Sequence, residues 1–244
     1  MVQLKYFGDN RDFFKYDLIT SIFCSTSSLC NYVFVPMLTE HRVDNEGNIP
    51  PRNIGGKSEG LLSFIKGCEN KSLTHWKTWL LPLVNSYETI EPSDSTFFSD
   101  RAREQYWENF NPMLIKEDAL IFIDPDTGLE TGKPSYLNRM GREKYILNEE
   151  IDILYNYLHS SSILMVYQHL PNNKDIHQCS VRNKLSQLKA ESGGNWVCAY
   201  REDDLAFLFI AKNKDLFNEL RNILKDYYDK SLHKLKSLHF DNSS

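Results

Sequence analysis

Short apolar runs alternate with amphipathic segments along most of the chain. The runs at Tyr32–Leu38, Ala119–Ile123 and Ser162–Tyr167 are continuously apolar, which is typical of strands buried on both faces. Segments with helical spacing lie between them, and two of these cover residues 12–30 and 98–113. The alternation predicts an α/β fold with a mainly parallel sheet that is covered by helices on both faces.

The C-terminal part has a different pattern. The segments "NWVCAYR" and "DLAFLFIAK" read as two strands joined by "EDD", which predicts a terminal antiparallel hairpin. The last segment, 213–238, has the spacing of a long amphipathic helix. Further expected elements are helices over 59–67, 71–81, 149–159 and about 175–191, and a strand over 84–91.

Residues 39–70 interrupt this regular alternation. The stretch "TEHRVDNEGNIPPRNIGGKS" at 39–58 concentrates turn-forming residues, and long loops in compact domains tend to be functional or mobile. We interpret 39–70 as a long loop or insert within a single α/β domain that spans 1–244.

Composition narrows the class of protein. The chain has 244 residues, of which 41% are hydrophobic, and its net charge of −5 argues against nonspecific wrapping of duplex nucleic acid. No apolar stretch approaches the roughly 18–20 residues that span a bilayer, and the charged N-terminus lacks the apolar core of a secretory signal. We therefore expect a cytoplasmic protein with no membrane partner. The five scattered cysteines show neither a disulfide framework nor zinc-site spacing.

The stretch "LIFIDPDTGLETGK" at 120–133 is the first candidate for chemistry. Asp124 and Pro125 follow a buried strand, so a carboxylate at the sheet edge can accept a proton or bind an amine. Asp126 has the same catalytic potential, and Glu130 can join both acids around a divalent cation. The same residues also make a good turn, so the sequence leaves these interpretations open.

The stretch "YFGDNRDFFKYDL" at 6–18 is the second candidate. Gly8 suits a turn or a close backbone approach, and Asp12, Lys15 and Tyr16 occupy the first turns of the expected helix. These side chains can face one pocket, since helix N-termini favour anionic ligand groups. An N-cap followed by a solvated, salt-bridged face explains the pattern as well.

The stretch "VYQHLPNN" at 166–173 is the third candidate. Tyr167 and Gln168 follow a buried strand and can hold a flat base by stacking and edge hydrogen bonds. His169 can serve as a base or a metal ligand, or be purely structural. Because the carboxyl ends of parallel strands meet at one edge, we expect these residues near Asp124.

Two of these stretches resemble a known family. "GDNRDFFKY" is similar to the Gly-Asn-x-x-Asp-x-x-Lys-His signature of RlmJ-type ribosomal RNA adenine methyltransferases, and "LIFIDPD" looks like their strand with an Asp-Pro catalytic motif. The resemblance implies a class I methyltransferase-like fold with S-adenosylmethionine at the carboxyl edge of the sheet. It implies that Asp124 engages the target amine, that Gly8 and Asp12 belong to the cofactor site, and that Lys15 and Tyr16 lie near the cofactor.

The chain departs from that family in two respects. Pro36 stands where members have a Gly-rich turn after the first strand, and Asp126 stands where a second Pro is usual. Three functions therefore remain open: an S-adenosylmethionine-dependent methyltransferase acting on a nucleic-acid base, a metal-dependent nuclease or phosphodiesterase, or a non-catalytic binding protein on the same fold. The nuclease would hold Mg²⁺ or Mn²⁺ between clustered carboxylates, for which the candidates are Asp9, Asp124, Asp126 and Glu130. The expected partner is nucleic acid, whether RNA or DNA, and the sequence leaves the oligomeric state open.

Overall fold

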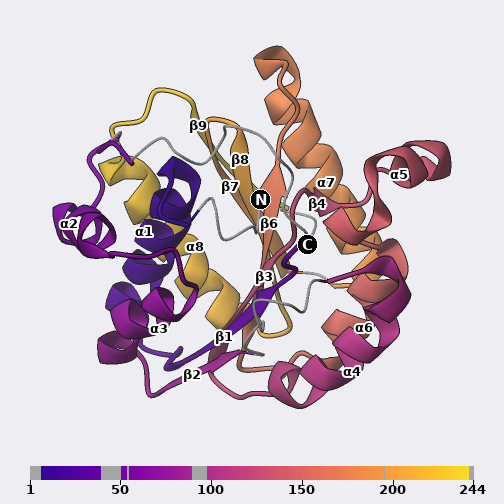
Figure 1. Ribbon diagram of the computed structural model, residues 1–244, viewed down its shortest axis with the longest axis horizontal. Coiled ribbons are helices and arrows are strands. Elements are labelled where there is room, and N and C mark those ends of the chain that lie inside the picture. Colours follow the sequence, from indigo (N-terminus) through magenta and orange to yellow (C-terminus); the bar gives the residue numbers. More distant parts are fainter. Residues whose placement is uncertain (1–6, 40–50, 54, 90–97, 195, 242–244) are drawn as a thin grey trace.

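The computed structural model describes residues 7–39, 51–53, 55–89, 98–194 and 196–241. These residues form a seven-stranded sheet in the order β2-β1-β3-β6-β8-β7-β9 (Figure 1). Its strands are β1 (Asn31–Pro36), β2 (Ser86–Thr89), β3 (Ala119–Asp124), β6 (Ile163–His169), β7 (Trp196–Glu202), β8 (Leu205–Ala211) and β9 (Lys236–Phe240). A second, two-stranded sheet pairs β4 (Gly128–Leu129) with β5 (Tyr145–Ile146).

The large sheet is parallel on one side and antiparallel on the other. Strands β2, β1, β3 and β6 run parallel to one another, whereas β8 pairs antiparallel with β6 and β7, and β9 pairs antiparallel with β7. Strands β7 and β8 are joined at residues 203–204 as the hairpin that the sequence predicts. The prediction of an α/β fold with a mainly parallel core and a terminal antiparallel hairpin is confirmed, and the architecture is Rossmann-like.

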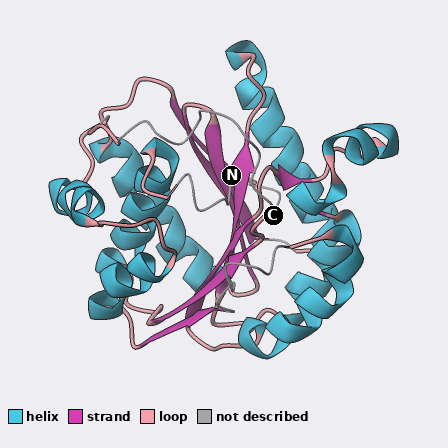
Figure 2. Cartoon of the chain, viewed as in Figure 1, coloured by secondary structure: helices cyan, strands magenta, loops and turns pink. Residues whose placement is uncertain are grey.

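Helices cover both faces of the sheet, as Figure 2 shows. The α-helices of the described residues are α1 (Asn10–Ser25), α2 (Glu59–Gly67), α3 (Thr74–Leu80), α4 (Arg103–Leu114), α5 (Pro134–Met140), α6 (Asn148–Tyr157), α7 (His177–Ser192) and α8 (Lys214–Lys230). One hydrophobic cluster joins α1, α2, α3 and α8 to one face, and another joins α4, α6 and α7 to the opposite face.

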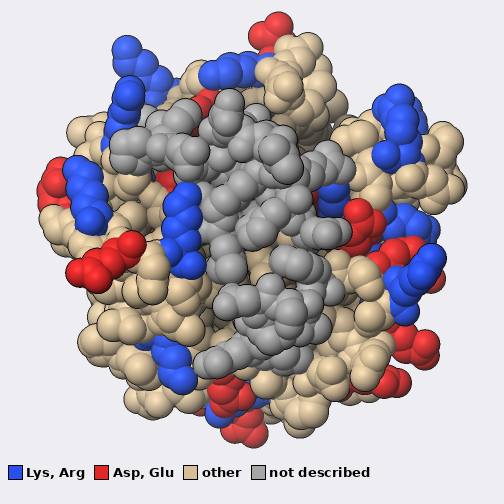
Figure 3. Space-filling model, in the orientation of Figure 1, with Lys and Arg blue, Asp and Glu red and all other residues tan. Residues whose placement is uncertain are grey.

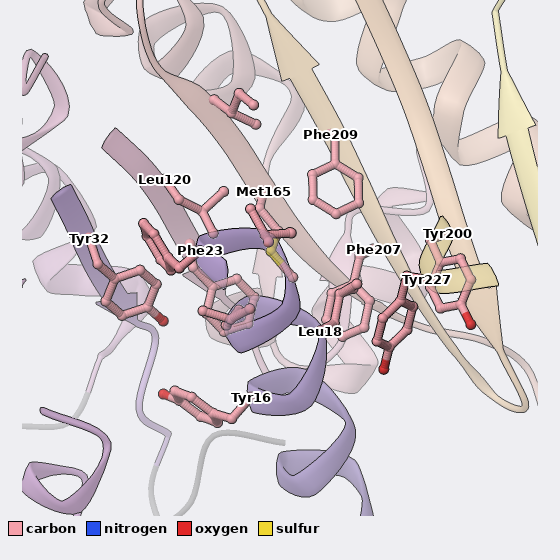
Figure 4. Close-up of a cluster of buried hydrophobic side chains, with 14 of the residues drawn as sticks. Tyr16, Leu18, Phe23, Tyr32, Leu120, Met165, Tyr200, Phe207, Phe209 and Tyr227 are labelled. Carbon is pink, nitrogen blue, oxygen red and sulfur yellow. The ribbon is translucent and has the colours of Figure 1, made fainter. Parts of the chain in front are cut away.

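The continuously apolar strands of the sequence are explained by this arrangement. Along β3, Leu120 and Phe122 belong to the α1 face, while Ile121 and Ile123 belong to the α4 face. Figure 4 shows the α1 face, where Phe23 of α1 packs near Leu120 and the neighbouring strands. A strand that is buried on both faces has no polar positions, so its sequence does not show which side chains point to which face.

The prediction of one helix over 213–238 is wrong in its last third. Helix α8 ends at Lys230, and residues 236–240 form β9 at the edge of the sheet. Strand β9 pairs antiparallel with β7, and Leu238 lies opposite Tyr200. Ladder hydrogen bonds to β7 therefore override the helical spacing of this segment, because strand formation depends on a partner that is distant in sequence.

The predicted loop or insert at 39–70 contains regular structure. Residues 40–50 and 54 lie outside the described residues, but α2 occupies Glu59–Gly67. Ser58 caps α2 by accepting a hydrogen bond from Leu61 N, and its own backbone N donates to Asp17 Oδ1 of α1. The second half of 39–70 thus packs on α1.

The topology determines where a ligand would bind. Strand β1 has β2 on one side and β3 on the other, so the chain order reverses between β1 and β3. Ligands of open α/β sheets bind beyond the carboxyl ends of strands at such a reversal. Pro36 and Asp124 are the last residues of these two strands, and they pair directly. Among the described residues, no helix has the length and apolar character needed to cross a bilayer.

Candidate functional site

The start of α1 brings charged side chains to the carboxyl edge of the sheet. Asp9 caps the helix, because its Oδ1 accepts hydrogen bonds from Arg11 N and Asp12 N at 2.8 and 2.9 Å. Gly8 has φ +72°, and a Cβ there would lie 2.6 Å from the Ile65 side chain. Glycine is therefore required at this position both by the backbone conformation and by the contact with α2.

Lys15 connects this helix to the end of β3. Its Nζ lies 2.8 Å from Asp124 Oδ2 and 3.3 Å from Asp12 Oδ1, and all three side chains are largely buried. Asp12 Oδ2 also accepts a hydrogen bond from Gly8 N. The ammonium lies 4.4 Å from the centre of the Tyr167 ring on β6. Side chains from all three sequence candidates, which are spread over more than 100 residues, thus form one cluster.

The charged groups in this cluster shift one another's pKa values. Burial alone would lower the pKa of Lys15, but the charges of Asp124 and Asp12 outweigh it and raise that pKa above its ordinary value. Burial raises the pKa of Asp12 to about 6, because Lys15 only partly offsets it. Lys15 therefore stays charged at neutral pH and compensates the buried Asp124 carboxylate.

Asp124 and Tyr167 leave polar atoms without partners. Asp124 is 3% exposed and Tyr167 is fully buried, yet Asp124 Oδ1 and the Tyr167 hydroxyl have no hydrogen-bond partner among the described residues. Ile123 pairs with Val166, so the next residues, Asp124 and Tyr167, lie side by side at the ends of adjacent strands. Burial raises the pKa of Tyr167, so its hydroxyl keeps its proton. The edge therefore presents an acceptor next to a donor.

His169 lies two residues further along β6, near the surface. Burial and the nearby charge of Arg11 lower the pKa of His169 to about 4, so the imidazole is neutral at physiological pH. Its Nδ1 lies 3.8 Å from Asp204 Oδ2, and the same oxygen pairs with Arg11 at 2.8 Å. These three side chains are about 30% exposed, and they are the most accessible part of the cluster.

Asp126 belongs to the turn that follows β3, and it points into the protein. It is 3% exposed, its Oδ2 lies 3.7 Å from Lys144 Nζ, and its Oδ1 is buried with no hydrogen-bond partner in the described part of the chain. His169 N donates to Thr127 O at 2.8 Å, which holds this turn against the end of β6. Figure 1 shows β4 beside β6 at this point.

Gln168 holds the same turn from the other face of β6. Its Oε1 accepts from Leu129 N at 2.9 Å, and its Nε2 donates to the carbonyls of Thr127 and His169. Gly128 makes room for it, since a Cβ at that position would lie 2.4 Å from Gln168 Oε1. Gln168 was predicted to contact a substrate, but its side-chain amide is fully engaged in hydrogen bonds to the backbone.

Tyr16, predicted to lie near a cofactor, packs on α3 instead. Its ring stacks on Trp76 with centroids 3.6 Å apart and an interplanar angle of 11°. Figure 4 shows Tyr16 on α1 at the margin of the hydrophobic cluster. This contact packs α1 against α3 and so helps to position Lys15, which directly precedes Tyr16 on α1.

The end of β1 does not fit S-adenosylmethionine. Met37 N donates to Asp124 O and Phe98 N donates to Leu38 O, so β1 continues as paired, extended chain past the reversal point. The Tyr106 hydroxyl donates to the Pro36 carbonyl, and burial together with the charge of Asp124 raises its pKa. Side chains therefore fill the place where a small-residue turn would admit the cofactor.

The described residues also offer no set of ligands for a metal ion. Among the described residues, no three His, Cys, Asp or Glu side chains are arranged to hold a cation. Asp9 is engaged as a helix cap, and the backbone of Glu130 is held by Lys184 and Gln187 on α7. Asp124 and Asp126 each face a lysine instead of each other. We derive no metal-dependent step from these four predicted carboxylates.

Three members of the site were missed in the sequence. Arg11 stands inside the "GDNRDFFKY" motif, and its position in the first turn of a helix beside two acids was an available signal. Asp204 lies in the "EDD" turn, where only the folding of β8 against β6 brings it to His169. Lys144 carries no local signal, because its contact with Asp126 depends on the β4–β5 pairing.

The described surface carries both signs of charge. In Figure 3, Lys or Arg and Asp or Glu side chains are interspersed around the visible face, and neither sign forms a continuous patch on its coloured part. This agrees with the net charge of −5 and favours local contacts over a broad electrostatic surface.

A comparison of the chain with protein-family models and with curated proteins found no match.

Proposed function

We propose that the protein binds a nucleobase that carries an exocyclic amine, in a nucleotide or a nucleic-acid strand, at the carboxyl edge of β3 and β6. The observation that carries this proposal is the pair of buried atoms, Asp124 Oδ1 and the Tyr167 hydroxyl, that have no partner among the described residues. Buried polar atoms are nearly always hydrogen-bonded, so an orphaned acceptor beside an orphaned donor indicates a ligand.

The chemistry of the two atoms indicates the class of ligand. Asp124 Oδ1 accepts a hydrogen bond, and the neutral Tyr167 hydroxyl donates one. Adenine and cytosine present the complement, an amine donor next to a ring-nitrogen acceptor. Lys15 compensates the charge of Asp124 at its other oxygen, so the carboxylate persists in a buried position. Uracil, which has a carbonyl in place of the amine, would set two acceptors against each other.

The Arg11–Asp204 ion pair is the most accessible part of the cluster, and we infer that a ligand enters there. Both charges act on the Tyr167 hydroxyl and on His169, and both side chains are about 30% exposed. A base reaches the buried atoms once this pair opens, and Arg11 is then free to pair with a phosphate group.

Calorimetric titration with AMP, CMP and UMP tests the proposal. We expect AMP or CMP to bind at least ten-fold more tightly than UMP. Tyr167→Phe removes only the unpartnered hydroxyl and should weaken AMP binding about five- to ten-fold, which corresponds to roughly one hydrogen bond. Tyr200→Phe is the matched control on β7, since it removes a buried hydroxyl that is bonded to Glu202. Equal affinity for AMP and UMP, or an unchanged affinity in Tyr167→Phe, would contradict the proposal.

Methyl transfer to the bound amine is a second candidate function. It is supported by the proximity of Gly8, Asp12, Lys15 and Asp124, the residues on which the resemblance to RlmJ-type methyltransferases rests. Because the described end of β1 does not fit the cofactor, we assign no step to S-adenosylmethionine. Calorimetry with the cofactor at millimolar concentration decides this candidate, and an absence of heat would reject it.

A further inference from the structure

A second pair of unpartnered polar atoms continues the first pair along the same edge. Asp126 Oδ1 and His169 Nδ1 are buried, and neither has a hydrogen-bond partner among the residues that the structure describes. The bond from His169 N to Thr127 O keeps the turn after β3 beside the end of β6. Asp126 directly precedes Thr127, so this bond places the backbones of Asp126 and His169 close together.

The two pairs share their surroundings. Arg11 and Asp204 act electrostatically on Tyr167 in the first pair and on His169 in the second. Asp124 and Asp126 are separated only by Pro125, so their Cα atoms lie at most about 7 Å apart. A ligand the size of a nucleoside can therefore reach from the first pair to the second.

The second pair requires a neutral group that donates hydrogen bonds. Asp126 is an acceptor whose charge is compensated by Lys144 on its other oxygen. His169 is neutral at physiological pH because burial and Arg11 lower its pKa, and in the tautomer with its proton on Nε2 it offers Nδ1 as an acceptor. Hydroxyl groups satisfy both atoms without adding charge, and a carboxylate that binds ribose hydroxyls is a recurrent arrangement in nucleotide-binding α/β proteins.

We propose that Asp126 and His169 bind the ribose hydroxyls of the ligand, so that the site selects ribonucleotides over deoxyribonucleotides. This inference rests on the proposed binding of a base at Asp124 and Tyr167, and it names the sugar of that ligand. Asp126 and His169 act here as specificity residues. Asp124 and Tyr167 read the base, and Arg11 remains available to the phosphate.

Titration of the unmodified protein with AMP and 2′-deoxy-AMP tests the inference without any substitution. We expect AMP to bind at least ten-fold more tightly than 2′-deoxy-AMP. Asp126→Asn should weaken AMP binding but change the affinity for 2′-deoxy-AMP by less than two-fold. Most of the preference for AMP over 2′-deoxy-AMP should therefore disappear. His169→Asn should reduce the preference in the same direction and keeps the test open if Asp126→Asn fails to fold. Asp203→Asn, an exposed acid in the neighbouring β7–β8 turn, is the matched control and should preserve the preference.

The outcomes separate this inference from the proposed function. Equal binding of AMP and 2′-deoxy-AMP, each tighter than UMP, overturns ribose selection and leaves base recognition in place. A ribose preference that survives in both Asp126→Asn and His169→Asn overturns the assignment to these residues. An absence of binding by all of these nucleotides overturns both proposals.

Discussion

Two buried ion pairs lie on opposite faces of the sheet, and they differ in how completely they are satisfied. On the α4 face, Arg103 donates to both oxygens of Glu150, and Trp107 and Leu147 donate to the same carboxylate. On the α1 face, Lys15 pairs with Asp124 Oδ2, while Asp124 Oδ1 has no partner among the described residues.

The difference distinguishes a structural network from the proposed binding site. Every oxygen of Glu150 is used, and Arg103 also donates to the carbonyls of Tyr145 and Arg142, so this network joins α4, α6 and β5. An unsatisfied buried oxygen costs about 1–3 kcal/mol, so the adjacent unpartnered atoms at Asp124 and Tyr167 support the proposal that a ligand uses them.

Arg103→Met should produce the largest effect on stability, a loss of about 3–5 kcal/mol, because Glu150 would stay buried without its cation. Denaturant unfolding measures the free energy of unfolding, and the affinity for AMP should stay unchanged in the folded variant. Arg101→Met, which alters an exposed arginine of the preceding turn, is the control and should change the free energy by less than about 0.5 kcal/mol. A small effect of Arg103→Met would mean that this network is not structural.

Asp124→Asn should lower the free energy of unfolding by less, about 2 kcal/mol, because Lys15 keeps Asp12 as a counter-ion. The same variant should lose most of its AMP affinity, since the acceptor charge is removed. Denaturant unfolding and calorimetry on one preparation check both effects. If Asp124→Asn loses stability but keeps its full affinity for AMP, the Lys15–Asp124 pair has only a structural role, like Arg103–Glu150.

Acidification should weaken the α1 face through His169, whose pKa falls from 6.5 to about 4 on folding. Below pH 6.5 the unfolded chain takes up the proton first, so the free energy of unfolding falls between pH 6.5 and 4. Asp12 acts in the opposite sense, because its pKa is raised to about 6 and its protonation favours the folded state.

The difference between the wild type and His169→Asn cancels the Asp12 contribution. We expect this difference in the free energy of unfolding to fall by about 1–2 kcal/mol from pH 7 to pH 4.5, after allowance for the partial exposure of His169. Urea titrations at both pH values give the result. A difference that is constant with pH would show that His169 is not desolvated.

Tyr167→Phe should have the smallest effect on stability, within about 0.5 kcal/mol, because its hydroxyl has no partner among the described residues. Tyr200→Phe should lower the free energy of unfolding by about 1 kcal/mol, because the Tyr200 hydroxyl donates to Glu202 at 2.8 Å. Thermal unfolding of the two variants compares them directly. A larger loss in Tyr167→Phe than in Tyr200→Phe would show that the Tyr167 hydroxyl is already satisfied in the folded protein.

The sequence by itself determined the class of fold and the position of the candidate site along the chain. Apolar runs such as Ala119–Ile123 can only be buried between two layers of helices, so the alternating pattern predicts the covered sheet. Residues that end such strands, Asp124 and Tyr167 among them, must then meet at one edge. Local patterns were sufficient because burial and strand direction are properties of each segment.

Only the tertiary structure decided which of these residues share a contact. Lys15 and Asp124 are partners because α1 lies on β3, whereas Gln168, which has similar polarity, faces the backbone on the other side of its strand. The segment 236–240 became β9 because β7 offered a free edge, against its helical spacing. Such outcomes depend on distant partners, and these set the energy of a buried polar group or an edge strand more strongly than local sequence does.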